Sequence, residues 1–128
     1  MPFTIETLEH QELTVIKAKG DILPGEPMKT IKAFYDGRPT KDCIWDFTAA
    51  SMSQMSTDEI QLILDHAMKN ILKRQFGKTA LVAPEDHDFE LARTTSTIGD
   101  LKDVPWDLQA FRTMEEAVQW LGVHYPEE

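Results

Sequence analysis

Short apolar runs alternate with amphipathic helical patterns along most of this chain, and the alternation restricts the fold more than any other feature. The runs CIWDF (43–47) and TALVA (79–83) are bounded by polar residues or proline, which is typical of buried central strands. Between them, apolar residues recur at spacings of three and four and predict a helix from about Thr57 to Gln75. Strands that alternate with helices indicate an α/β fold whose later strands run parallel, joined by right-handed helical crossovers.

A different pattern opens the chain. Residues 3–8 and 12–19 alternate apolar and polar side chains around the polar joint His10-Gln11, so we expect an antiparallel hairpin there. The whole pattern predicts a mixed sheet of about five strands with helices packed on it. The other expected elements are a helix over 26–35, a short helix over 85–94, a loop or frayed helix over 95–107, a strand over 108–111 and a helix over 114–121.

Length and charge limit the protein class. At 128 residues the chain is long enough for one domain, residues 1–128, and too short for two ordinary ones. No apolar run approaches the roughly 20 residues that span a bilayer, and the first residues lack the features of a secretory signal, so we expect a cytoplasmic location. The formal net charge of −9 opposes binding to nucleic acid or to anionic lipid headgroups, because both attract positive charge.

The loop that follows the strand at 43–47 is the main candidate site, because ligands bind at the carboxyl ends of parallel strands. Hydroxyl groups are frequent there, at Thr48, Ser51, Ser53 and Ser56. Ser56 begins a capping box, in which its oxygen accepts a helix N–H while Glu59 reaches back to the Ser56 N–H. Regulated phosphorylation of Ser56 is the alternative, and the carboxylates beside it oppose an added phosphate.

Apolar residues occur in the same loop and in one other. Met52 and Met55 belong to the loop, and Trp106 lies in the expected loop 95–107. Exposed apolar side chains in loops often mark contact surfaces, so we expect these three on the surface and expect exchange of the methionines for polar residues to cost little stability. Arg93 and the hydroxyls of 94–97 form either an anion site or an ordinary polar loop.

The sequence contains no motif for catalysis, nucleotide binding or metal coordination. A G-x-S-x-G elbow and both glycine-rich phosphate loops are missing, so no catalytic residue and no cofactor is expected. The acidic cluster E85-D86-H87-D88 lacks partners that would complete a metal site, and we expect it to be a solvated, negatively charged helix start.

The order of elements and the ending FRTMEEAVQWL (111–121) resemble the SpoIIAA-like branch of the STAS domains, sometimes grouped with SEC14-like lipid-binding domains. In that ending a short strand delivers Phe111, Thr113 caps a helix, and Trp120 is expected to be buried against the sheet. The resemblance implies a non-catalytic domain that docks to a partner. In this family, docking is controlled by phosphorylation of a serine just before the helix that follows the third strand.

This sequence departs from the family pattern at the phosphorylated serine. D46-F47-T48 matches the family's strand end, but Met55 stands where the serine would fall. Gln54 replaces the acidic residue before it, and Thr57 replaces a glycine. The phosphoserine switch is therefore not carried over to this chain.

The sequence thus predicts a bacterial, non-catalytic regulatory or binding module that docks a protein partner or a small apolar ligand at the loop edge 48–57. The alternative is a SEC14-like carrier with an internal lipid pocket. A homodimer is possible, and a ligand-free dimer would favour the docking hypothesis. The two hypotheses differ in where Met52, Met55 and Trp106 lie. A surface patch favours docking, whereas an enclosed cavity between helices and sheet favours a carrier.

Overall fold

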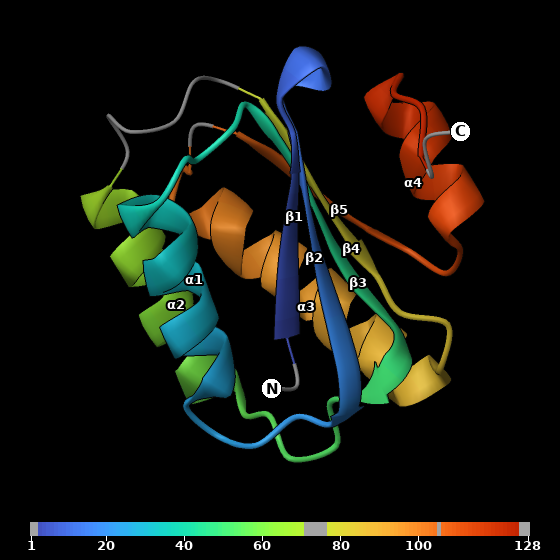
Figure 1. The fold of residues 1–128 in the computed structure, drawn as a ribbon. Coiled ribbons are helices and arrows are strands. Elements are labelled where there is room, and N and C mark those ends of the chain that lie inside the picture. Colours follow the sequence, from blue (N-terminus) through green and yellow to red (C-terminus); the bar gives the residue numbers. More distant parts are fainter. Residues whose placement is uncertain (1–2, 71–76, 105, 126–128) are drawn as a thin grey trace.

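The computed structural model describes residues 3–70, 77–104 and 106–125. A single sheet runs through the molecule with the strand order β1-β2-β3-β4-β5 (Figure 1). The first pair, β1 and β2, is antiparallel and the other three pairs are parallel, so the mixed sheet and the hairpin predicted from the sequence are confirmed. The strands are β1 Phe3–Leu8, β2 Leu13–Asp21, β3 Asp42–Ser51, β4 Lys78–Val82 and β5 Asp107–Phe111.

Four helices cover the sheet unequally. Figure 1 shows α1, α2 and α3 on one face and α4 alone on the other. Successive strand residues point to opposite faces of the sheet, so a strand contributes side chains to the cores on both faces. On β3, Trp45 packs under α1, α2 and α3, and its neighbour Ile44 packs under α4. No described helix is long and apolar enough to cross a membrane. The helices are α1 Glu26–Asp36, α2 Thr57–Lys69, α3 Asp86–Leu101 and α4 Met114–Leu121.

Helix α3 is longer than predicted, because it continues to Leu101 through residues expected to form a loop. The hydroxyls of Thr94, Thr95 and Thr97 each donate to the backbone carbonyl four residues earlier, at 2.9–3.2 Å. These bonds satisfy the threonine hydroxyls within the helix, and the Ser96 hydroxyl bonds to the Leu108 carbonyl of β5, so the segment is attached to the sheet as a helix. Of the two alternatives expected for 95–107, a loop or a frayed helix, the loop was therefore wrong for residues 95–101. Helix α2 ends at Lys69, and the remainder of its predicted span, residues 71–75, lies outside the described residues.

Strand β3 is also longer than predicted and runs to Ser51, so Thr48 and Ser51 are strand residues and not loop residues. Its extension is held by the parallel partner β2, with Lys19 opposite Ala49 and Asp21 opposite Ser51. One irregularity interrupts this register between Lys17 and Lys19. The loop between β3 and α2 is consequently short and consists of residues 52–56.

Helix α4 has the predicted bounds, but its tryptophan is less buried than expected. Ala117 and Leu121 face the sheet and are buried. Trp120, in the last turn of the helix, is half-buried. Its ring centroid lies 5.4 Å from that of Phe111 and 5.0 Å from the Lys78 ammonium nitrogen. Trp120 packs against the core under α4 but is only half-buried, so the prediction that it is a buried core residue was wrong.

Candidate functional site

The loop 52–56 leaves the carboxyl end of β3 and turns directly into α2. The Ser56 hydroxyl accepts the Glu59 N–H at 3.2 Å, which confirms the predicted helix cap. The second half of the expected capping box is different, because the Glu59 carboxylate accepts the Gly25 N–H at 3.1 Å. Glu59 therefore links the start of α2 to the residue that precedes α1.

The two methionines of this loop point into the molecule. Met52 is only 5% exposed and belongs to the core between the sheet and the helices, and Met55 is half-buried against that core. The loop closes on itself through a bond from the Met55 N–H to the Met52 carbonyl at 3.0 Å. The expected surface patch at Met52 and Met55 was therefore wrong, because the loop folds back over the helical face of the sheet.

Asp88 is the residue that holds this loop inward. Its carboxylate accepts the Met52 N–H at 3.2 Å, and the residue is 3% exposed. Asp88 lies in the first turn of α3, where the positive end of the helix favours a negative charge. The sequence indicated a solvated cluster at 85–88, and this was wrong for Asp88. Its contact with Met52 spans 36 residues and has no local signal.

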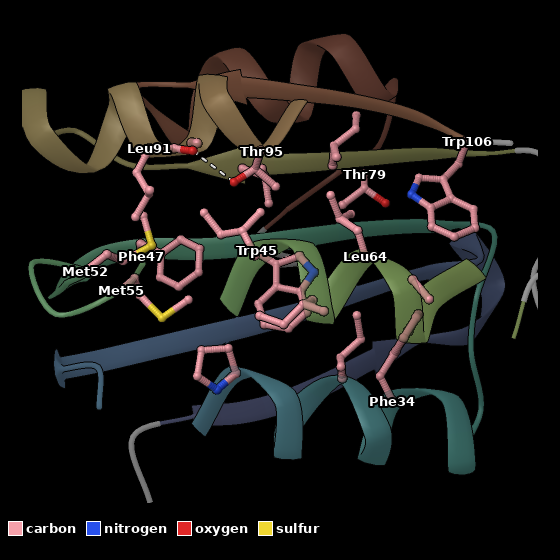
Figure 2. A pocket seen from close by; sticks show the side chains of 18 of the residues that line it. Phe34, Trp45, Phe47, Met52, Met55, Leu64, Thr79, Leu91, Thr95 and Trp106 are labelled. Atoms are coloured by element: carbon pink, nitrogen blue, oxygen red, sulfur yellow. Dashed lines mark hydrogen bonds between the residues drawn. The ribbon is translucent and has the colours of Figure 1, made fainter. Parts of the chain in front are cut away.

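Together with the helices, the loop encloses an apolar pocket of about 100 Å³ against the sheet. Figure 2 shows Met52 and Met55 at one end of this pocket and Trp106 at the other. Trp106 is 5% exposed, which corrects its expected surface position. The walls come from α1, α2, α3 and from the strand residues Trp45, Phe47 and Leu81. Met52, Met55 and Trp106 thus line one pocket inside the molecule and do not form the expected surface patch.

One polar group in the pocket stands out. Thr79, at the start of β4, faces the pocket and is 4% exposed. Its Oγ1 is the single buried side-chain oxygen or nitrogen without a hydrogen-bond partner in the described part of the chain. Sequence reasoning had treated Thr79 only as part of a strand. Thr95 also lines the pocket, but its hydroxyl is bonded to the Leu91 carbonyl at 2.9 Å (Figure 2).

The other hydroxyl residues of the predicted site do not line this pocket. The Thr48 hydroxyl donates to the Asp46 carboxylate at 2.7 Å. Both residues alternate with Ile44 along β3 and therefore lie on the face of the sheet that α4 covers. Ser51 is half-buried, and its Oγ accepts the Ser53 N–H at 3.4 Å. Ser53 itself is exposed. These residues therefore surround the outer side of the loop.

Arg93 lies away from the loop. It pairs with Glu90 on the same helix at 3.3 Å and lines a polar groove between α3 and β5. The middle of this groove is bridged by a hydrogen bond from the Ser96 hydroxyl to the Leu108 carbonyl. Within residues 3–70, 77–104 and 106–125, no group of three His, Cys, Asp or Glu side chains could hold a metal ion.

Comparisons with solved structures confirm the SpoIIAA-like fold. An uncharacterised protein of the DUF3478 family from Shewanella loihica PV-4, described as having that fold, matches with a TM-score of 0.58 at 15% identity, covering 93% of this chain and 91% of its own. The Bacillus cell fate determinant SpoIIAA in its phosphorylated form matches with a TM-score of 0.51 at 20% identity, covering 92% and 97%. No family model and no curated protein matches the sequence.

Proposed function

We propose that this protein is a non-catalytic binding module of the STAS type that holds a small apolar ligand between the sheet and α1, α2 and α3. The observation that carries the proposal is the inward position of Met52, Met55 and Trp106 around one pocket. Aromatic and aliphatic walls with few polar groups are typical of small-molecule sites. The flexible methionines at one end can adapt to the ligand's shape.

The volume of the pocket argues against a lipid carrier. Pockets for drug-sized ligands usually enclose about 300–1,000 Å³, whereas this one encloses about 100 Å³. An engineered apolar cavity of about 150 Å³ is enough to bind benzene. The pocket is smaller than that cavity, so a ligand of one aromatic ring is the upper limit of its size and would require the flexible Met52 and Met55 side chains to move. An acyl chain would require the helices to separate from the sheet.

Docking of a protein partner through apolar loop contacts is also less favoured. Such docking would use Met52 and Met55, but Met52 is buried and Met55 is half-buried against the core. The outer side of the loop exposes Ser53 and Gln54 instead. Any partner that binds this loop would contact polar groups, and the position of these groups depends on how Met52 and Met55 pack in the pocket beneath them.

Toluene is a suitable first probe, because it is apolar and close to the expected size. Titration into ¹⁵N-labelled protein should shift the amide signals of pocket residues such as Phe47, Leu81 and Ala92. Ala92→Leu places three further carbons at the pocket wall and should weaken these shifts, since Ala92 is buried and lines the cavity. The matched control is Ala33→Leu, which adds the same atoms at an exposed position of α1.

Two results would contradict the proposal. In one, toluene leaves the pocket amides unshifted in the wild-type protein. In the other, Ala92→Leu binds toluene as tightly as Ala33→Leu does. Native mass spectrometry of freshly purified protein complements this test, because a retained adduct of small mass would identify a natural ligand, and an adduct of lipid mass would restore the carrier hypothesis.

A further inference from the structure

The hydroxyl of Thr79 is an exception among the buried threonines of this chain. Thr14 and Thr40 share a hydrogen bond of 2.7 Å, and the Thr30 hydroxyl donates to the Glu26 carbonyl at 3.0 Å. Thr79 is equally buried, yet its Oγ1 has no partner within the described residues. A buried hydroxyl without a hydrogen bond destabilises the folded protein, so such groups are rare and usually have a role.

The position of Thr79 suggests that role. Thr79 lies opposite Cys43 in the register of β3 and β4. Cys43 precedes Phe47 by four residues on β3, which corresponds to about 13 Å along the strand. In Figure 2 it lies toward the end of the pocket at which Trp106 is found, away from Met52 and Met55. The pocket is therefore apolar at its loop end and carries an unused hydrogen-bonding group toward its other end.

We propose that Thr79 recognises the ligand: the pocket takes a molecule of about one ring in size that bears a single hydroxyl, and this hydroxyl bonds to Thr79 Oγ1. This inference rests on the proposed function of the pocket and adds the polar half of the ligand. A hydroxyl suits the site because it can both donate and accept, as the threonine can. A charged group does not suit it, since none of the described residues that line the pocket is ionised.

Phenol and toluene test the inference because they have nearly the same shape and differ in a hydroxyl against a methyl group. The dissociation constants of both are measured by ¹⁵N chemical-shift titration for the wild-type protein and for Thr79→Val. The ratio of the toluene constant to the phenol constant should fall about tenfold in Thr79→Val, which corresponds to one hydrogen bond. Toluene should bind to this variant at least as tightly as to the wild type.

Thr95→Val is the matched control. It removes a second hydroxyl from the same pocket, but one that is bonded to the Leu91 carbonyl, so the ratio should stay unchanged. If Thr79→Val does not fold, the pair Thr79→Ser and Thr79→Ala replaces it. Both variants lack the methyl group and only the serine keeps the hydroxyl, so the ratio should fall in Thr79→Ala alone.

The outcomes separate the two proposals. If neither probe shifts the pocket amides, the proposed function fails and the role of Thr79 fails with it. If toluene binds but the ratio is the same in wild type and Thr79→Val, the pocket is a ligand site and the role of Thr79 in recognition is refuted. An equal fall in Thr95→Val would also refute that role, because general pocket polarity would then explain the preference.

Discussion

Removal of the Asp88 carboxylate should loosen the loop 52–56 and destabilise the protein. Asp88→Ala deletes the acceptor of the Met52 N–H at a site where Asp88 is 3% exposed, so water does not readily replace it. A hydrogen bond to a charged group contributes about 1.5–3 kcal/mol, and a carboxylate in the first turn of a helix adds about 0.3–1 kcal/mol. We therefore expect the free energy of unfolding to fall by about 2–4 kcal/mol.

A second substitution at the same position divides this effect into its parts. Asp88→Asn keeps an oxygen that can accept the Met52 N–H and loses only the negative charge. Its cost should be about 1 kcal/mol, close to the helix-end contribution alone. A cost for Asp88→Asn equal to that of Asp88→Ala would show that charge, and not the hydrogen bond to the loop, is what matters at this position.

The control for burial is Asp86→Ala, two residues earlier in the same helix turn. Asp86 pairs with Arg112 at 2.8 Å, but its side chain is 92% exposed, so the expected cost is only about 0–1 kcal/mol. Urea unfolding followed by tryptophan fluorescence measures all three variants, because Trp45 and Trp106 line the pocket. Equal stability of Asp88→Ala and Asp86→Ala would refute the reasoning that the buried contact holds the loop.

Four further substitutions test other parts of the structure by the same unfolding measurement. Ser56→Ala should cost about 1 kcal/mol by removing the helix cap, and an unchanged midpoint would contradict the observed bond to Glu59. Met52→Ala should cost about 2–5 kcal/mol as a buried truncation and Met55→Ala clearly less, so equal losses would argue against the inward position of Met52. Trp120→Ala should cost about 2 kcal/mol, below the range for buried aromatic residues, and a larger loss would restore the core position expected from the sequence.

The strands could be predicted because their signal is local. The alternation over 3–8 and 12–19 and the apolar runs at 43–47 and 79–83 each depend on neighbouring residues only, and each run became a strand. The end of α3 was missed for a related reason. Its threonines and serine favour loops by composition. In the structure the threonine hydroxyls bond to carbonyls four residues earlier, and the Ser96 hydroxyl bonds to the Leu108 carbonyl of β5, a contact that has no local signal.

The positions of three pocket residues along the chain could be predicted, but their orientation could not. Met52, Met55 and Trp106 lie outside helices and strands, as expected, yet the direction of their side chains depends on contacts between distant segments. Met52 turns inward because Asp88 receives its N–H from 36 residues away. The role of Thr79 had no local signal either, since an unpartnered hydroxyl can be recognised only when every surrounding group is in place.

The slender attachment of the loop 52–56 sets an expectation for how long a ligand stays bound. Two of its residues, Met52 and Met55, line that end of the pocket, and the Met52 N–H donates to Asp88 of α3. To open this end, the buried Met52 must leave the core, and openings of this kind take microseconds to seconds. We therefore expect exchange of ligand with the surroundings on this timescale, so that occupancy follows the free concentration.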